Sequence, residues 1–418
     1  MKIKKIYSIF KQYPTICTDS RKIKNRGIFF SLKGKNFNGN KYALKAIQNG
    51  CSYAIVDEKE YNIHPNTILV KDALKTLQDL ATYHRNQLNI PLIGITGTNG
   101  KTTSKELINA ILSCELSCYA TKGNLNNHIG VPLSVLEINQ EHKIAIIEMG
   151  ANQQKEIEFL CNIAQPTYGI ITNIGSAHLE GFGNLQGVID TKKELYEFIS
   201  QNKGHLFVNV DDELLLSLSK GIMQTTYGKS GNIMGIVTGI TPLLSIKYNN
   251  EVINSHLIGE FQFSNILAAI CIGNYFNVTR QNIKRSIENY IPTNNRSQLV
   301  KTKTNTLILD AYNANPSSMK AMLNSFANQQ YKNKLCILGD MLELGGESNK
   351  EHLDIIKLTN KLELDCLFVG KIFNSLTENG FKTRNELAKN IQKNNIYNKT
   401  ILLKGSRGIG LEQLIENL

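Results

Sequence analysis

A short apolar segment that runs into a glycine-rich turn and then into an amphipathic stretch constrains this chain most. Residues 91–96 (PLIGIT) predict a strand, and residues 101–113 have the 3.6-residue apolar period of a helix. Glycines let the intervening turn, GTNGKTT, bend tightly, so that N–H groups and the helix N-terminus face one anion. The sequence therefore predicts a nucleotide-phosphate cradle formed by Gly97, Thr98, Asn99, Gly100, Lys101, Thr102 and Thr103.

Two side chains of this turn have the chemistry that a nucleotide needs. Lys101 would bring positive charge to the terminal phosphates, and the Thr102 hydroxyl is placed to hold Mg²⁺. The strict pattern requires a glycine at position 95, which is Ile95 here; Gly94 lies one residue too early and Gly97 two too late. The alternative is a glycine-rich turn with a surface lysine. The strand before it and the helix after it favour the cradle.

Length and composition indicate a soluble protein of several domains. A chain of 418 residues predicts about three domains, and 41% hydrophobic and 20% charged residues are ordinary for a globular protein. The N-terminus lacks the apolar core of a signal peptide, and no apolar run approaches the ~20 residues of a membrane span. The eight cysteines are scattered, mostly within apolar patterns, which indicates buried thiols in a reducing cytoplasm rather than disulfides or a metal site.

The net charge of +12 leaves two interpretations open. It could indicate a nucleic-acid partner, but the lysines are spread along the chain and form no basic arm or stripe interleaved with aromatic residues. We therefore expect a solvated basic surface and no nucleic-acid partner. The same charge suits small anionic substrates.

The order of the predicted elements indicates an α/β protein of three domains. Residues 1–89 mix short strands with two helical stretches, and residues 90–295 alternate apolar strands with helices, as in a parallel sheet. A second α/β pattern occupies residues 296–418 and ends in a helix. Two successive domains of this kind predict an active site in the cleft between them. The predicted strands are 27–32, 53–57, 67–70, 92–96, 144–149, 169–173, 206–209, 306–310, 334–339, 365–370 and 400–404.

Polar residues follow several predicted strands, where doubly wound sheets bind their ligands. Glu148 ends an apolar strand near the cradle, where its carboxylate could be a ligand of Mg²⁺. The alternative is that Glu148 caps a helix or lies in a surface loop. Asp310 ends a later strand and suits ribose hydroxyls, or a helix N-cap. His178 follows a third strand, although a lone histidine is usually structural. Lys192, on the next predicted helix, would by itself indicate only a solvated face.

Together these motifs resemble the Mur ligases, ATP-dependent enzymes of peptidoglycan precursor synthesis. The resemblance extends over essentially the whole chain and is greatest to the type that adds D-alanyl-D-alanine to a UDP-muramoyl tripeptide. It implies a small N-terminal α/β UDP-binding domain, a central parallel-sheet P-loop ATPase domain and a C-terminal Rossmann-like domain. The segments that carry it are 18–21, 97–103, 123–132, 147–151, 177–183, 310–316, 338–345 and 404–407.

The resemblance also implies roles for single residues around ATP and two Mg²⁺ ions. Lys101 would bind the β- and γ-phosphates, Thr102 and Glu148 would hold one Mg²⁺, and His178 would help to hold the second. Lys192 matches the lysine that the family carries as a carbamate, an anion able to ligate metal near the transferred phosphate.

Further roles concern the rest of the nucleotide and the two other substrates. Asn265 would contact adenine, Arg296 the phosphates and Asp310 the ribose, although Phe261 and Gln262 replace the family's usual His-Asn and Asn295 its usual glycine before the arginine. The resemblance places the UDP-sugar at Ser20, Arg21 and Ser31. It places the muramoyl peptide at Asn126 and Asn127.

The implied reaction activates a carboxylate as an acyl phosphate, which the amine of D-alanyl-D-alanine then attacks. We expect small-molecule substrates, a monomer and a cytoplasmic location. The alternatives are a sister ligase such as folylpolyglutamate synthetase, a basic NTP-dependent regulator that binds nucleic acid, and a binding module that has lost catalysis. The third residue of the peptide substrate, lysine or meso-diaminopimelate, is left open.

Overall fold

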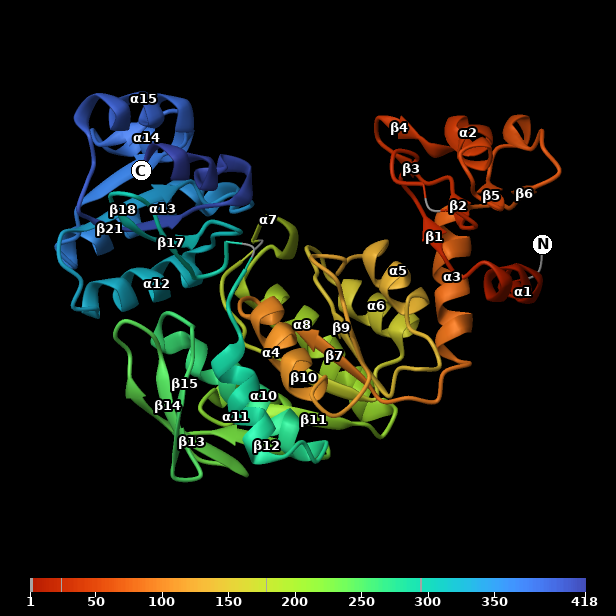
Figure 1. Ribbon diagram of the computed structural model, residues 1–418, viewed down its shortest axis with the longest axis horizontal. Coiled ribbons are helices and arrows are strands. Elements are labelled where there is room, and N and C mark those ends of the chain that lie inside the picture. Colours follow the sequence, from red (N-terminus) through yellow and green to blue (C-terminus); the bar gives the residue numbers. More distant parts are fainter. Residues whose placement is uncertain (1–2, 24, 178, 294) are drawn as a thin grey trace.

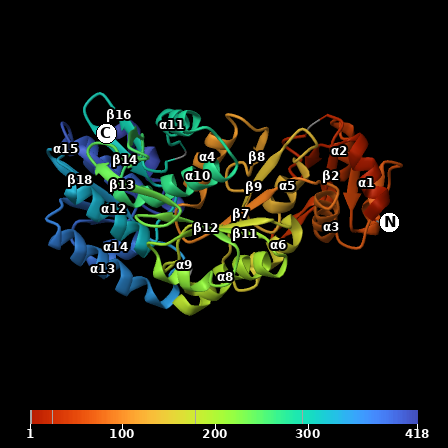
Figure 2. The same ribbon diagram turned by 90° about the horizontal axis from the view of Figure 1, so that it is seen from below.

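The computed structural model describes residues 3–23, 25–177, 179–293 and 295–418. These residues form a four-stranded, a nine-stranded and a six-stranded sheet, together with a two-stranded hairpin. In Figure 1 the N-terminal elements lie at the right, the nine-stranded sheet lies in the middle, and the six-stranded sheet lies at the upper left. The turned view in Figure 2 separates the same three parts along the long axis of the molecule.

The first part is a small parallel sheet with helices packed against it. Its strand order is β1-β2-β5-β6, and the hairpin β3–β4 follows β2. Helix α3 begins at an Asp72 cap, whose side chain accepts from the N–H of Lys75 at 2.8 Å. The same helix contacts α5 and α6 of the central part and so joins the two. The elements are α1 (Ile3–Gln12), β1 (Ile16–Cys17), β2 (Ile28–Phe30), β3 (Lys33–Gly34), β4 (Phe37–Asn38), α2 (Ala43–Gln48), β5 (Tyr53–Val56), β6 (Thr67–Leu69) and α3 (Ala73–Arg85).

The central sheet is parallel from β8 to β13 and ends in an antiparallel extension. In spatial order its strands are β15 (Glu251–Asn254), β14 (Ser245–Tyr248), β13 (Ile233–Gly239), β12 (Gln224–Gly228), β11 (His205–Asn209), β10 (Tyr168–Ile171), β7 (Leu92–Thr96), β9 (Ile144–Glu148) and β8 (Cys118–Ala120). One apolar core lies under α3, α5, α6 and α8, and a second lies under α4, α10 and α11. Because β10, β7 and β9 are parallel neighbours, the segments that follow them meet at one edge.

Helices cover both faces of the central sheet. For this reason β7 and β9 are apolar up to their last residues, Thr96 and Glu148, and every residue of both strands is buried. The helices of this part are α4 (Lys101–Leu112), α5 (Gly130–Leu136), α6 (Glu156–Ala164), α7 (Leu179–Phe182), α8 (Leu185–Gln201), α9 (Glu213–Leu218), α10 (Phe263–Tyr275) and α11 (Arg280–Asn289).

The C-terminal part is a second sheet with helices on both faces, and only its edge strand β16 is antiparallel. Its spatial order is β16 (Gln298–Lys301), β17 (Thr306–Asp310), β21 (Thr400–Lys404), β18 (Lys334–Gly339), β19 (Cys366–Val369) and β20 (Gly380–Phe381). Its helices are α12 (Pro316–Asn328), α13 (Ser348–Lys361), α14 (Lys371–Leu376) and α15 (Arg384–Asn394).

The predicted α/β class is confirmed, and four strands have the predicted bounds (β7, β17, β18 and β21). The predicted C-terminal helix is instead a run of 3₁₀ turns, Leu411–Asn417. The antiparallel extension β13–β15 was not predicted. The domain boundaries after residues 89 and 295 stay predictions. Among the described residues, no helix is long and apolar enough to cross a membrane, and the cysteines form no disulfide bond. The prediction of buried thiols is wrong for Cys114, which is exposed.

Candidate active site between the central and C-terminal sheets

The predicted cradle is a tight turn between β7 and α4. Gly97 has φ 144° and Gly100 has φ 78°, values that favour glycine. Neighbouring atoms impose the same choice, because a Cβ on Gly97 would lie 2.0 Å from Oγ1 of Thr172 and one on Gly100 would lie 2.6 Å from Oδ1 of Asn265. The turn therefore brings its backbone close to β10 and α10, and α4 begins directly after it.

Lys101 is held within this turn. Its Nζ donates to the carbonyl oxygen of Gly97 at 2.6 Å and to that of Thr98 at 3.0 Å. Burial lowers the pKa of Lys101 to about 8, and the charge of Arg296 acts in the same direction. The ammonium group thus donates to carbonyl oxygens of the turn, and phosphate oxygens could take the place of these acceptors.

Glu148, at the end of β9, lies beside the start of α4. Its Oε2 accepts a hydrogen bond from the hydroxyl of Thr102 at 2.9 Å, and its Oε1 accepts one from Nδ2 of Asn126 at 2.9 Å. A further cation, Nζ of Lys105, lies 3.9 Å from Oε2 and donates to the carbonyl of Thr121 at 2.7 Å. The carboxylate is buried, yet each of its oxygens has a polar neighbour.

Lys192 lies on α8 with only 3% of its surface exposed. Burial, and then the charge of Lys101, lower its pKa to about 7. Its Nζ lies 5.6 Å from the centroid of the Phe182 ring. A lysine in this environment is neutral far more often than a surface lysine, and the neutral amine is the nucleophilic form. The remaining residue predicted for this region, His178, lies outside the described residues.

The C-terminal part supplies an acid and two cations. Oδ2 of Asp310, at the end of β17, lies 2.5 Å from Nζ of Lys404, which is fully buried at the end of β21. Oδ1 of Asp310 accepts from the backbone N–H of Ser297, which fixes the connector next to Arg296. The guanidinium carbon of Arg296 lies 3.7 Å from the centroid of the Tyr312 ring, in cation–π geometry.

Asn265, predicted to contact adenine, joins α10 to the cradle helix. Its Oδ1 accepts from Oγ of Ser104 at 3.0 Å, and its Nδ2 donates to Oε1 of Gln262 at 2.7 Å. Asn265 and Gln262 both line the same cavity as Lys101. The glutamine that replaces the family's usual asparagine therefore orients Asn265 directly.

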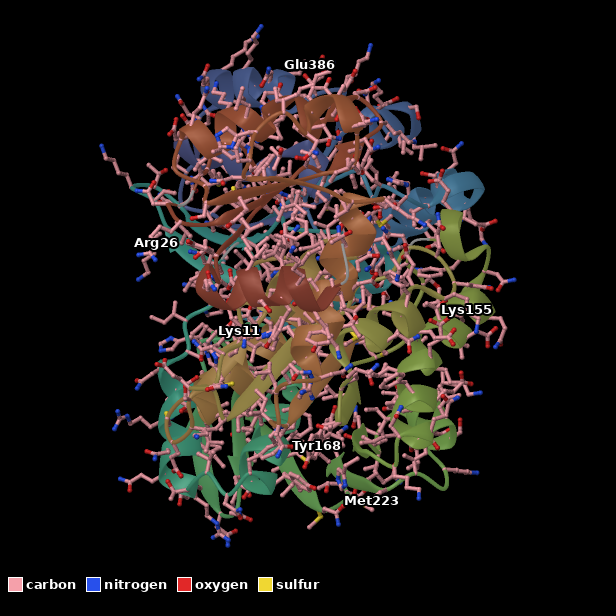
Figure 3. The ribbon with its side chains drawn as sticks, turned by 90° about the vertical axis from the view of Figure 1, so that its right-hand side faces the viewer. Lys11, Arg26, Lys155, Tyr168, Met223 and Glu386 are labelled. Atoms are coloured by element: carbon pink, nitrogen blue, oxygen red, sulfur yellow. The ribbon has the colours of Figure 1, made fainter. Side chains whose placement is uncertain are left out.

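One cavity of about 760 Å³ brings these groups together. Its lining residues come from the central and C-terminal parts, whose arrangement Figure 1 shows, and many of them follow the carboxyl ends of the parallel strands. The predicted residues that line it are Gly97, Thr98, Asn99, Gly100, Lys101, Thr102, Thr103, Asn126, Asn127, Glu148, Lys192, Asn265, Arg296 and Asp310. A cluster of aromatic rings that includes Tyr168 lies at the amino ends of the central strands, away from the cavity. Figure 3 shows Tyr168 and Met223 at the lower end of the molecule.

The residues predicted to hold the UDP-sugar do not line this cavity. Both Nε and Nη2 of Arg21 pair with the carboxylate of Asp19 at 2.9 Å, and the Arg21 side chain is largely exposed. Ser20, beside it, is half-buried. Oγ of Ser31 is shielded from solvent and hydrogen bonds to no other described residue, so a ligand could reach it only after neighbouring atoms moved.

Asn127 has a local structural role that the sequence prediction did not include. Its Oδ1 accepts from the N–H groups of Ile129 and Gly130, at 3.1 and 2.9 Å, where α5 begins. The sequence assigned no role to Tyr312 and Lys404, which line the cavity, or to Lys105, which lies beside Glu148. Lys105 could have been found, because it lies four residues after Lys101 and so on the same face of α4.

Comparisons with known proteins agree with this geometry. The chain matches the Mur ligase middle domain over residues 95–273 and the Mur ligase glutamate ligase domain over residues 295–407. The chain belongs to the Mur ligase family. The predicted resemblance is thereby confirmed, and with it the prediction that the chain is an ATP-dependent ligase.

Relatives of known name match along almost their whole length. The UDP-N-acetylmuramoyl-tripeptide–D-alanyl-D-alanine ligase of Bacillus subtilis is 31% identical over 96% of this chain and 92% of its own. The ligase of the same name from Buchnera aphidicola subsp. Baizongia pistaciae is 34% identical over 97% and 92%. A crystal structure of MurF from Acinetobacter baumannii superposes with a TM-score of 0.87 at 30% identity, over 100% of this chain and 98% of that one.

Proposed function

We propose that this chain joins D-alanyl-D-alanine to the terminal carboxylate of a UDP-N-acetylmuramoyl-tripeptide, with conversion of ATP to ADP and phosphate. The observation that carries the proposal is the single cavity in which Lys101, Glu148 and Lys192 of the central part face Arg296 and Asp310 of the C-terminal part. The curated relatives named for this reaction cover the chain at 31–34% identity and support the choice of substrates.

The residues present fit Mg²⁺. The Thr102 hydroxyl and the Glu148 carboxylate are oxygen ligands of the kind that Mg²⁺ prefers, and they lie 2.9 Å apart beside the cradle. When bound, the ion would neutralise charge on the phosphate oxygens during phosphoryl transfer. A second ion would need an anionic ligand on the α8 side of the cavity, and a carbamate on Lys192 would supply one. The low pKa of Lys192, about 7, suits carbamate formation, because only the neutral amine adds carbon dioxide.

The chain's own residues orient and neutralise the reacting groups. The Lys101 ammonium exchanges the carbonyls of Gly97 and Thr98 for oxygens of the β- and γ-phosphates. Arg296 adds a second cation from the connector, and Asp310 accepts hydrogen bonds from the ribose. The peptide carboxylate then attacks the γ-phosphorus and ADP leaves. This step gives an acyl phosphate whose carbonyl carbon the free amine of the dipeptide attacks, and phosphate departs with one oxygen of the former carboxylate.

The distribution of charge supports an anionic substrate at the N-terminal part. Residues 1–89 contain 16 Lys and Arg but only 6 Asp and Glu, so most of the net charge of +12 lies there. Lysines and arginines occur along the whole chain, but residues 1–89 contain few of the acids that offset them elsewhere. Lys11 and Arg26 are both exposed, and Figure 3 shows Arg26 at the margin of this part. A basic surface raises the local concentration of a nucleoside diphosphate, and attraction of this kind weakens with salt.

The roles of Ser20, Arg21, Ser31, Asn126 and Asn127 toward the UDP-muramoyl substrate stay predictions. Monomeric state, cytoplasmic location and the absence of a nucleic-acid partner are likewise predictions.

Mass spectrometry of the reaction products tests the proposal. The chain is incubated with ATP, Mg²⁺ and a UDP-muramoyl tripeptide, with D-alanyl-D-alanine, with L-alanyl-L-alanine, or with neither dipeptide. We expect a product heavier by one dipeptide minus water, formed with D-alanyl-D-alanine and not in the two controls. Product from a folate and glutamate instead would assign the chain to the sister ligases. Phosphate release at the same rate with and without each acceptor would contradict ligation.

A further inference from the structure

We propose that Asn99, Asn315 and Ser317 form a polar latch that positions the C-terminal part over the phosphate cradle. Nδ2 of Asn99 donates to Oγ of Ser317 at 2.9 Å, and that hydroxyl donates to Oδ1 of Asn315 at 2.8 Å. Nδ2 of Asn315 in turn donates a hydrogen bond to Oδ1 of Asn99 at 2.8 Å. The three side chains thus close a ring of hydrogen bonds in which each donor has one acceptor, an arrangement whose members strengthen one another.

On the central side, Asn99 is fixed by the end of β10. Its backbone N–H donates to Oδ1 of Asn173 at 3.0 Å. Its carbonyl accepts from the hydroxyl of Thr172 at 2.6 Å and from Nδ2 of Asn173 at 3.0 Å. With its backbone held at both polar atoms, Asn99 presents its amide to the C-terminal part in a defined direction.

On the other side, the latch is built into the start of α12. Oδ1 of Asn315 also accepts from the N–H of Ser318 at 2.8 Å, and Oγ of Ser318 accepts from the N–H of Asn315 at 3.1 Å, which completes a capping box. Pro316 at the first helical position fixes the approach of the chain. Asn315 is 7% exposed, so its amide is oriented by the helix before it meets Asn99.

The latch lies close to the groups that face the nucleotide. Asn315 follows Asp310 by five residues, and Asp310 holds the connector at Ser297, next to Arg296. Asn99 precedes Lys101 by two residues in the cradle. The ring therefore fixes Asp310 and Arg296 relative to Lys101. Since phosphoryl transfer depends on position, loss of the ring should slow turnover without removal of any group that contacts substrate.

Other contacts limit the size of the effect. Helix α7 also contacts the 3₁₀ turn Gly345–Glu347 of the C-terminal part. Opening of the ring should therefore loosen the arrangement and not separate the two parts. Asn315 and Ser317 are accordingly positioning residues, and Asn99 has this role in addition to its place in the predicted cradle.

Adjacent serines provide a matched test. Ser317→Ala removes the hydroxyl that bridges Asn99 and Asn315, whereas Ser318→Ala removes only the capping-box partner at the same helix start. We expect Ser317→Ala to lower kcat about 10-fold, because both hydrogen bonds of this hydroxyl are lost and the Asn99 amide is left without its acceptor. Ser317→Thr keeps the hydroxyl and should restore kcat. Ser318→Ala should lower the unfolding temperature and leave kcat within about 2-fold of the wild type.

Small-angle X-ray scattering gives a readout that does not depend on turnover. Ser317→Ala should increase the radius of gyration of the full chain, and Ser318→Ala should not. If Ser317→Ala does not fold, Asn315→Asp takes its place, because aspartate still caps α12 but cannot donate to Asn99. Unchanged scattering and unchanged kcat in the folded variant would overturn the latch. The effect on kcat rests on the proposed function, but scattering decides the latch even if the wild type shows no ligation.

Discussion

A rise in pH from about 7 to about 9, in buffer free of carbon dioxide, should stabilise the folded chain through the buried amine of Lys192. Burial and the charge of Lys101 lower the pKa of Lys192 from 10.5 to about 7. The folded state therefore binds fewer protons at this amine than the unfolded state does between these two values. Stability from this residue rises with pH across that window and is lost as the pH falls toward 7.

The size of the effect follows from the two pKa values. At pH ~7 the unfolded lysine is almost fully protonated and the folded one about half protonated; at pH ~9 the folded amine is neutral while the unfolded one is still charged. Integration of the proton-binding difference over these two pH units gives a gain of about 2 kcal/mol in the free energy of unfolding. Such a gain corresponds to a rise of several degrees in the unfolding temperature.

Lys192→Met and Lys193→Met provide the comparison. Lys193 is the next residue, is 40% exposed and pairs with Glu197 at 2.8 Å. Unfolding temperatures of the three proteins are recorded across the pH range without nucleotide. Lys192→Met should lose the ~2 kcal/mol that the Lys192 amine supplies and keep only the smaller rise from Lys101, whose pKa is lowered to about 8. Lys193→Met should keep both. The reasoning would be refuted if the wild type and Lys192→Met changed in parallel, because the Lys192 amine would then titrate in the same way in both states.

Two further predictions concern the cavity. Lys101→Ala should abolish ADP formation while circular dichroism shows an intact fold, because the cation that would bind the phosphate oxygens is gone. Lys122→Ala is the control, since Lys122 is exposed and pairs with Glu137. Retained turnover in Lys101→Ala would argue against the cradle. Removal of dissolved carbon dioxide should lower the phosphate-release rate of the wild type and added bicarbonate should restore it, whereas a rate that does not respond to bicarbonate would exclude a required carbamate on Lys192.

Local patterns predicted the parts of the fold that are buried and regular. The strands β7, β17, β18 and β21 have their predicted bounds because each is a short apolar run covered on both faces. The hairpin β14–β15 was missed although a signal exists, since Asn249 and Asn250 have φ of 46° and 66°, and paired asparagines favour such turns. Strand β13 alternates exposed with half-buried residues, so it has no apolar run to detect.

The site was predicted where one segment carries the chemistry. Lys101 and Thr102 lie in the glycine-rich turn, and Glu148 is an acid at the end of an apolar strand, where a carboxylate needs a partner. The partners themselves could not be predicted. Lys404 pairs with Asp310 and Ser317 with Asn99 across long stretches of chain, and neither periodicity nor spacing records a contact that only the folded arrangement creates.

The proposed function depends on activation of the peptide carboxylate by ATP in the cavity between the central and C-terminal parts. Isotope transfer tests it most directly. A UDP-muramoyl tripeptide labelled with ¹⁸O in its terminal carboxylate is ligated to D-alanyl-D-alanine, and the released phosphate is analysed by mass spectrometry. We expect one ¹⁸O atom in each phosphate, because the bond from that oxygen to phosphorus forms before the amine attacks. Phosphate free of ¹⁸O alongside the ligated product would contradict it.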